Sequence, residues 1–426
     1  MVLNHALVRE TRITLSGGSQ VFFIPRDWTQ TFCLRLYFPI GTYLETDSDN
    51  GISALSIRML LEGTKEKNFL ALAEELESVG IEYQIFTTGI QFHCPTLLQD
   101  HLIQFISEVL CFSEPTRERF EQTMRHMRSE LKISMDDSDQ LAFTRLRQLV
   151  FRGNVGALFP AGTKESLNAI SFEDFLVFQK QHVSAQNLRI YISGKIDESS
   201  FFKSLDRALD LFQIGEKRII TLPEVEQTQQ NRSYHVLKDR SQSSVVIGHQ
   251  GIVKWSEDYS KLKVMDQILG QSMGLTCRLA GRLREDLGLC YSVFGDITST
   301  ASKLPGLFQA YIGTNPNTVE QALDEMGKTI LQFIEDGPEI GEVEDTRLQL
   351  MEGFVFQFET NASMVQLIYE KDVYGLGEDF LIREQQEIKG ITCEEVHRVA
   401  AKYICPEKLV TVVVGKEPIK GFELLD

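Results

Sequence analysis

The chain has 426 residues, 42% of them hydrophobic, and its 60 acidic and 43 basic residues give a formal net charge of −17. This length predicts two or three domains with sizeable hydrophobic cores. The acidic balance argues against nucleic acid and anionic membrane surfaces as partners.

The seven cysteines are scattered along the chain, and none lies in a C-x-x-C pair. This pattern is typical of reduced thiols rather than of a disulfide framework. The first residues, MVLNHALVRETRITL, lack the basic start and the long apolar run of a signal peptide. No stretch approaches the roughly 18 apolar residues of a membrane span. We therefore expect a cytoplasmic protein without a membrane partner.

Strand and helix patterns are interleaved from the N-terminus onward. The expected elements are a hairpin at 12–25, a buried strand at 31–41, two helices within 50–80, a strand pair at 81–95, a helix at 96–112 and a long helical region at about 115–151. Turn residues separate most of these segments, beginning with the Gly-Gly pair of the first hairpin. The alternation predicts a protein that mixes helices and sheet.

The two helices within 50–80 have recognisable ends. Asp49 or Asn50 is expected to accept hydrogen bonds from the first free N–H groups of the first helix. Gly63 and Gly80 suit the position that ends each helix with a positive φ angle.

Ala54, Ile57 and Arg58 fall at positions i, i+3 and i+4 of the first helix, so they share one face. A zinc-peptidase helix carries His, Glu and His at this spacing, because two imidazoles one turn apart can bind one metal ion. Here the capped helix that would carry such a site is present, and the three functional side chains, His, Glu and His, are absent.

An internal repeat indicates a duplication. ISFEDFLVFQKQHVSAQNLRIYISGK begins at Ile170, and ITCEEVHRVAAKYICPEKLVTVVVGK begins at Ile391, an offset of 221 (391 − 170). Both segments predict a helix followed by a strand that ends in Gly-Lys, so we expect two homologous α/β domains. The expected ranges are 1–212 and 234–426, joined by a polar linker at 213–233.

Several segments jointly resemble the pitrilysin/insulinase zinc peptidases, in particular their short branch that is similar to the mitochondrial processing peptidase. They are GTYLETDSDNG, EGT, LAEELESVG and FTT in the first half, and GRLREDLGLCYSVFG and VTVVVGKEP in the second. The resemblance implies an α+β fold of two homologous domains in a clamshell arrangement, each a mainly antiparallel sheet covered by helices. It also implies that two such chains pair to enclose a chamber in which peptides are cut.

The family's inverted motif, His-x-x-Glu-His, falls on Ala54, Ile57 and Arg58, so both imidazole ligands and the general base are missing. The family's third ligand, a Glu, falls on Glu130, 72 positions past Arg58 (130 − 58), and an auxiliary Glu falls on Thr123. One carboxylate cannot hold a catalytic zinc ion that needs three protein ligands and a water molecule. We therefore expect no metal in this chain and zinc in a partner.

Other functional positions of the family are kept or replaced by similar residues. Its substrate-contacting Arg and Tyr, seven positions apart, match Arg284 and Tyr291, which would donate to the oxyanion that forms during peptide hydrolysis. The family's substrate-binding edge strand matches Gln84, Phe86 and Thr87, with Gln84 in place of the usual Asn.

Simpler interpretations of the same residues stay open. Arg58 is equally an ordinary helix-face residue, which could pair with Glu130, and His126 with Glu130 is more typical of a solvated helix face than of a metal site. Without the resemblance, Arg284 and Tyr291 would be a surface residue and a core residue.

Two hypotheses follow. In the first, the chain is a non-zinc subunit, inactive alone, that supplies Arg284 and Tyr291 to a homologous partner with an intact His-x-x-Glu-His motif and a peptide substrate. In the second, it is a structural subunit or a peptide-binding module of the same fold without enzymatic activity. A homodimer is an alternative assembly where no partner is present.

Overall fold

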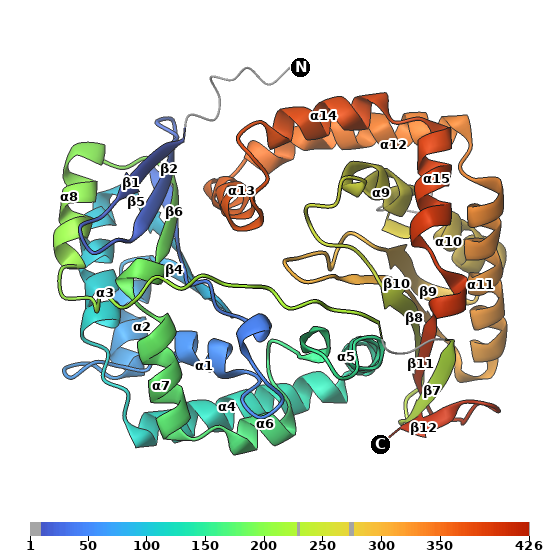
Figure 1. Ribbon diagram of the computed structural model, residues 1–426, viewed down its shortest axis with the longest axis horizontal. Helices are drawn as coiled ribbons and strands as arrows, with labels where there is room; N and C mark the ends of the chain where they lie inside the picture. The colour runs from blue at the N-terminus through green and yellow to red at the C-terminus, as the bar shows by residue number, and fades with distance from the viewer. Residues whose placement is uncertain (1–9, 228–230, 272–276, 426) are drawn as a thin grey trace. The chain divides into compact units, whose positions relative to one another are not determined.

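The computed structural model describes residues 10–227, 231–271 and 277–425, and it divides into two compact units (Figure 1). Unit 1 contains the chain up to Leu131 together with Leu158–Thr221 and Val355–Val373; unit 2 contains Lys132–Ala157, Leu222–Phe354 and the chain from Tyr374 onward. Each unit therefore includes one segment from the opposite half of the sequence. The expected absence of a leader concerns residues 1–9, which lie outside the described ranges. Within those ranges, no helix is long and apolar enough to cross a membrane.

Unit 1 is built on a six-stranded sheet whose order is β1-β2-β6-β3-β5-β4. Its strands are β1 (Thr11–Thr14), β2 (Gln20–Pro25), β3 (Thr31–Tyr37), β4 (Glu82–Phe86), β5 (Gly89–Pro95) and β6 (Arg189–Gly194). All neighbours are antiparallel except β2 and β6, which are parallel. The predicted hairpin, buried strand and strand pair are confirmed.

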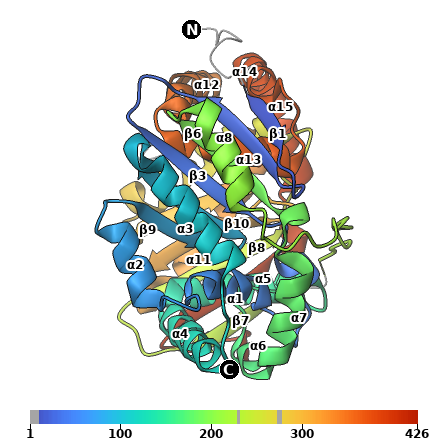
Figure 2. The same ribbon diagram turned by 90° about the vertical axis from the view of Figure 1, so that its left-hand side faces the viewer.

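Helices cover both faces of this sheet. The helices of unit 1 are α1 (Ile52–Arg58), α2 (Phe69–Glu77), α3 (Gln99–Cys111), α4 (Arg117–Asp136), α6 (Lys164–Ala169), α7 (Phe172–His182), α8 (Glu198–Ala208) and α13 (Asn361–Tyr374), and the last turn of α4 belongs to unit 2. On one face, α3 and α8 lie side by side (Figure 2), where Phe105 packs against Phe92 and Phe201 against Phe32. On the other face, Tyr369 of α13 contacts Tyr37 of β3 at 5.2 Å between ring centres.

Unit 2 repeats this plan with the strand order β12-β7-β11-β8-β10-β9. Its strands are β7 (Arg232–Leu237), β8 (Ser243–Gln250), β9 (Cys290–Asp296), β10 (Leu307–Thr314), β11 (Val410–Gly415) and β12 (Glu423–Leu425). The helices are α5 (Ser138–Val150), α9 (Tyr259–Asp266), α10 (Arg278–Ala280), α11 (Val319–Asp336), α12 (Ile340–Gly353), α14 (Phe380–Gly390) and α15 (Cys393–Tyr403), with π-helical turns at Gln267–Gln271 and Gly281–Asp286.

The central strand β8 is buried on both faces along nearly its whole length. Val245 and Ile247 belong to the core that also contains Val396 of α15. On the opposite face, Leu146 of α5 lies against Gly248, where a Cβ atom would come within 2.9 Å of it. Helices therefore cover both faces of the sheet in unit 2, as they do in unit 1.

The predicted duplication is visible in the secondary structure. Adding 221 to the bounds of α7 and β6 gives 393–403 and 410–415, which are the bounds of α15 and β11. The capping boxes also correspond, with Ser171 and Asp174 in the first copy and Thr392 and Glu395 in the second. The expected fold of two related, mainly antiparallel sheets covered by helices is confirmed.

The long helical region at 115–151 is confirmed as two successive helices, α4 and α5, because Asp137 interrupts it and its side chain caps α5 through the N–H of Gln140. One local expectation is wrong. Neither Asp49 nor Asn50 caps α1; the carboxylate of Glu45 does so instead. The predicted ranges 1–212 and 234–426 are continuous, whereas each unit of the structure takes a segment from the other half.

Candidate functional site

The three positions of the inverted zinc motif lie on α1. Ala54 and Ile57 are buried, with 8% and 0% of their surfaces exposed, and only Arg58 reaches solvent. The guanidinium of Arg58 forms a two-pronged ion pair with Glu130 of α4, at 2.7 Å from Nη2 to Oε2 and 3.1 Å from Nη1 to Oε1. The pairing suggested by charge is thus present in the structure. The retained carboxylate is bound to an arginine instead of a metal ion.

A buried carboxylate holds the first turn of α1 in place. Glu45 is 3% exposed and accepts hydrogen bonds from the N–H groups of Gly51 at 2.9 Å and Ser53 at 3.0 Å, and from the side-chain amide of Asn50 at 2.8 Å. The first N–H groups of a helix have no partner within the helix, and a negative charge there is favourable. Glu45 therefore fixes the end of the helix that precedes Ala54.

Glu62 is a further carboxyl group beside this face. Burial raises its pKa, and this is partly offset by a hydrogen bond with Thr123 and by the positive charges of His126, Arg119 and Arg58. The sequence interpretation missed Glu62, which lies just past the 3-10 turn Met59–Leu61 that follows α1. Among the described residues, no three His, Cys, Asp or Glu side chains gather closely enough to hold a metal ion.

The strand β4 lies beside α1 and forms one edge of its sheet, because it pairs only with β5. Gln84 is exposed, the ring of Phe86 lies under the guanidinium of Arg35 at 4.4 Å, and Thr87 follows in the turn. Burial, and then the charges of Glu77 and Glu62, raise the pKa of Tyr83. The expected edge strand is therefore present, next to the degenerate zinc helix.

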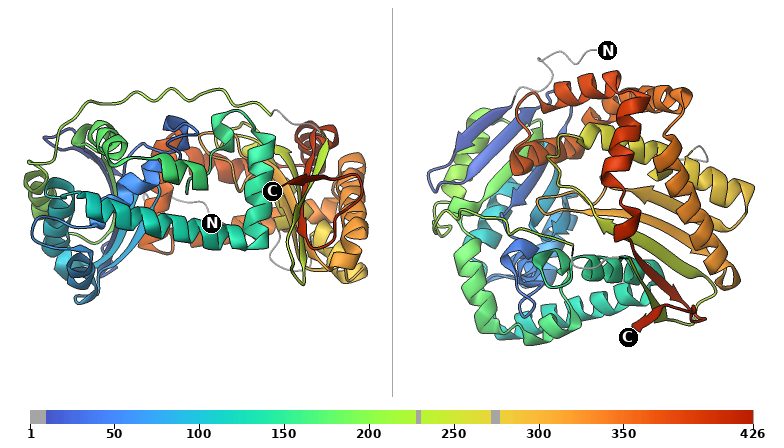
Figure 3. Two further views of the ribbon diagram at one scale, coloured as in Figure 1. Left: turned by 90° about the horizontal axis from the view of Figure 1, so that it is seen from below. Right: turned by 45° about the vertical axis from the view of Figure 1, so that its right-hand side comes forward.

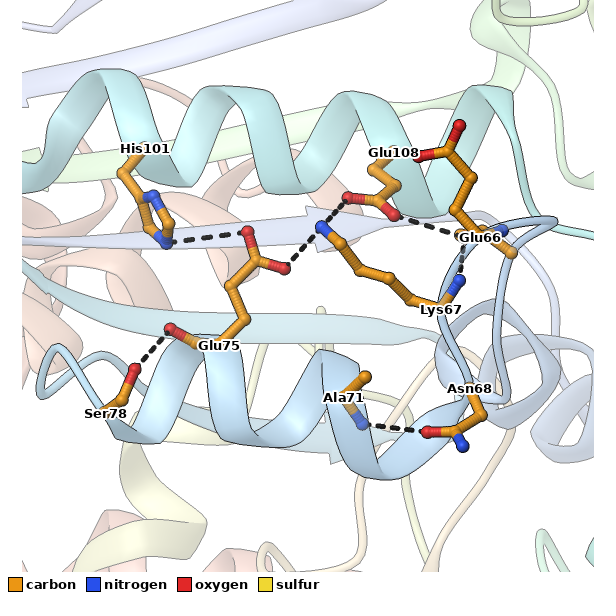
Figure 4. A network of polar contacts seen from close by, with 9 residues as sticks. Glu66, Lys67, Asn68, Ala71, Glu75, Ser78, His101 and Glu108 are labelled. Carbon is orange, nitrogen blue, oxygen red and sulfur yellow. Dashed lines mark hydrogen bonds and ion pairs between the residues drawn. The ribbon is translucent and has the colours of Figure 1, made fainter.

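A polar network fixes the loop between α1 and α2 (Figure 4). The Lys67 ammonium donates to Glu75 of α2 at 2.8 Å and to Glu108 of α3 at 2.6 Å, and the Thr64 hydroxyl also donates to Glu108. Gly63 opens the loop with a φ angle of +141°, and a Cβ atom there would lie 2.7 Å from the carbonyl oxygen of Lys67. Because α2 leads into β4, this network also anchors the edge strand.

Arg284 and Tyr291 come together in unit 2. Arg284 is in the π-helical turn Gly281–Asp286, Gly288 makes the following turn with a φ angle of +61°, and Tyr291 is the second residue of β9. The guanidinium carbon of Arg284 lies 5.2 Å from the centre of the Tyr291 ring. Tyr291 is 80% exposed, which is unusual for an aromatic side chain, and β9 is an edge strand like β4.

Family models match both halves of the chain. Residues 21–158 match the model described as insulinase (peptidase family M16), and residues 169–350 match the peptidase M16 inactive domain. The chain belongs to the M16 peptidase family. With its zinc motif replaced at Ala54, Ile57 and Arg58, it is an inactive-type member.

Individual relatives agree with this assignment. A non-peptidase homolog, YmxG, from Helicobacter pylori is 26% identical over 369 residues, which are 85% of this chain and 84% of the relative. The mitochondrial-processing peptidase subunit beta of Lentinula edodes is 21% identical and covers 94% of this chain and 89% of its own length.

Solved structures share the fold. The crystal structure of a protease from Helicobacter pylori matches with a TM-score of 0.88 at 16% identity, covering 96% of this chain and all (100%) of that one. A chain of Complex III2 from Candida albicans matches with a TM-score of 0.78 at 18% identity, covering 95% of this chain and 96% of that chain.

Proposed function

We propose that this chain is the non-zinc subunit of a two-chain metallopeptidase. The observation that carries the proposal is the contrast between the two units. On α1, the metal-binding positions are two buried apolar side chains and an arginine that is paired with Glu130. In unit 2, Arg284 and Tyr291 are still placed together, with the tyrosine largely exposed. A homologous partner with an intact His-x-x-Glu-His motif would hold the zinc, and this chain would form half of the chamber.

In this proposal Arg284 and Tyr291 act on the partner's reaction. When a peptide carbonyl is attacked, negative charge develops on its oxygen, and N–H and O–H donors held in place beforehand stabilise that charge. The guanidinium of Arg284 and the hydroxyl of Tyr291 are donors of this type. The partner's zinc, when bound, activates the attacking water.

The edge strand β4 would bind the peptide itself. A strand at the edge of a sheet has backbone N–H and C=O groups without a neighbouring strand, and an extended peptide can pair with them. Gln84 is exposed on this strand, and Phe86 and Thr87 lie where it turns into β5. These three residues are the proposed contacts with the peptide in this chain.

The second candidate is a subunit without enzymatic activity. Its support is the contact between Arg284 and Tyr291, because a guanidinium stacked on a phenol ring can serve stability alone. The relatives include both a protein named as a non-peptidase homolog and a processing-peptidase subunit, so the two candidates agree with the names of known proteins. A cytoplasmic location stays a prediction from the sequence.

The test is to purify the complex from its source, reconstitute it from wild-type and variant chains, and measure peptide cleavage. Arg284→Ala and Tyr291→Phe should each lower turnover by roughly 10²–10³-fold, with a much smaller change in KM. Arg282→Gln, on the same helical turn, is the matched control and should cleave like the wild type. Equal rates from all assembled complexes would overturn the enzymatic proposal and favour the structural one.

A further inference from the structure

The segment after α8 runs as an extended trace without helix or strand, shown in Figure 3. We call its residues 213–227 the strap. Its first part is fixed to unit 1: the N–H groups of Ala185 and Gln186 donate to the carbonyls of Gln213 and Ile214, and the N–H of Arg218 donates to the Asn187 side chain at 3.0 Å. The N-terminal end of the strap therefore has a defined position in unit 1.

The last part of the strap is fixed to unit 2. Side-chain amides hold its backbone: Gln250 donates to the carbonyl of Val225 at 3.0 Å, and Asn154 donates to that of Glu226 at 2.8 Å. The Gln227 amide in turn donates to the carbonyl of Lys408 at 2.6 Å. Lys217 and Arg218, at the end of the first fixed part, have exposed side chains, and Ile219, which follows them, is 92% exposed. An exposed, extended segment with two basic residues is a favourable substrate for a trypsin-like protease.

Cutting the strap would not separate the two fragments if each fragment contributes a helix to the unit that the other fragment mainly forms. Residues 1–218 include α5, which belongs to unit 2. There the Asp139 carboxylate of α5 accepts hydrogen bonds from Ser244 at 2.5 Å and Tyr311 at 2.7 Å, and Phe143 stacks on Phe294. Leu141, Ala142, Leu146, Leu149 and Val150 of α5 are buried as well.

Residues 219–426 include α13, which belongs to unit 1. Its Asp372 carboxylate accepts hydrogen bonds from Arg189 at 2.6 Å and Tyr191 at 2.7 Å. The two exchanged helices, α5 and α13, are therefore anchored alike, each by an aspartate that is hydrogen-bonded to a tyrosine of the sheet. At the start of the helix, the Arg26 guanidinium donates to the Asn361 side chain at 3.1 Å. Met364, Val365, Leu367 and Ile368 are buried there.

We propose that the strap is a cleavage site at which a trypsin-like protease converts the chain into an assembled two-chain protein. Hydrolysis after Arg218 breaks one C–N bond, consumes one water molecule, and leaves a carboxylate on Arg218 and an amine on Ile219. Reciprocal exchange of elements is a known way to join polypeptides without a covalent link. The products, residues 1–218 and 219–426, stay together because each unit contains segments of both.

The experiment is limited trypsin digestion of the full-length native protein, with the cut mapped by mass spectrometry. The expected result is two fragments of similar size on a denaturing gel that elute as one species, at the position of the intact protein, in native size exclusion. The double variant Lys217→Gln/Arg218→Gln should resist the first cut. Fragments that separate or precipitate in native buffer, or a first cut outside the strap, would overturn the proposal.

A second measurement tests the anchors. Asp139→Ala and Asp372→Ala should each weaken the association of the nicked fragments at least about tenfold, because each leaves buried hydroxyl or guanidinium groups without their partner. The intact chains should still run as monomer-sized species. Asp379→Ala, which removes an exposed carboxylate paired with Arg383, is the matched control and should leave the association unchanged. Equal dissociation constants for all three variants would contradict the role given to the exchanged helices.

Discussion

Arg58 puts a permanent positive charge on the α1 face, where active relatives would place a metal-binding imidazole. Glu130 neutralises it with two contacts, so the carboxylate that could bind a metal already has a partner. A guanidinium and a carboxylate in this two-pronged arrangement form a stable pair without any ion between them. At this position a guanidinium, which is always charged, therefore stands where the family's motif has a neutral, metal-binding imidazole.

The Arg58–Glu130 pair should add little to stability. Its side chains are 33% and 57% exposed, and solvent screens such pairs, so Arg58→Ala or Glu130→Ala should lower the free energy of unfolding by less than about 1 kcal/mol. Denaturant titration of the single and double variants would measure this. A loss several times larger would mean that the pair holds α1 and α4 together.

The lowered pKa of His249 predicts that the stability of the protein depends on pH. Burial lowers the pKa of this histidine from 6.5 to about 4; its Nε2 accepts from the N–H of Cys405, and its Nδ1 contacts the carbonyl of Gln250. Between these pKa values the unfolded chain binds a proton that the folded chain does not, so stability falls as pH falls from about 6.5 to about 4, by about 3 kcal/mol for this group.

The measurement for His249 is the free energy of unfolding as a function of pH. The variant His249→Gln has no titrating ring and should show a shallower loss over the same window. Parallel curves for wild type and variant would show that another group causes the pH dependence.

At the level of elements, the first turn of α1 depends on Glu45. Glu45→Ala would leave buried N–H groups of Gly51 and Ser53 without an acceptor, and should cost about 2 kcal/mol of unfolding free energy. Asp47→Ala, an exposed carboxylate on the same loop, is the control and should change stability by less than about 0.5 kcal/mol. Thermal or denaturant unfolding compares them, and equal losses would show that Glu45 is not the cap.

The repeat and the strands could be predicted from sequence, because hydrophobic periodicity and turn residues are local signals. The cap of α1 could not, because Glu45 comes from the preceding loop, six residues before Gly51, instead of from the position next to the helix. The pairing of Arg58 with Glu130 followed from opposite charges at two family positions. Nothing in the sequence around Glu62 indicated its burial.

The exchange of α5 and α13 also lies beyond sequence patterns. The apolar side of residues 138–150 indicates that the helix is buried, and it does not indicate which of two related sheets buries it. Two continuous domains were therefore the natural prediction, and the exchanged segments became visible only through the tertiary contacts. Tertiary partners, unlike periodicity, are set by the whole fold.

At the scale of the whole molecule, the proposed roles are divided between this chain and a partner chain. This chain carries the M16 fold with an arginine pair in place of zinc ligands, and we propose that a partner supplies the metal while Arg284 and Tyr291 serve the partner's reaction. In this proposal the chain has no peptidase activity alone and becomes part of an enzyme only when it is assembled with that partner.

The most direct test is the zinc content of each polypeptide in the complex purified from its source. The account predicts a second chain with a His-x-x-Glu-His motif, one zinc ion per pair of chains, and no zinc bound by this chain when it is isolated. One tightly held zinc ion in the isolated chain, lost in Glu130→Ala, would contradict it, as would a native complex in which no chain carries that motif.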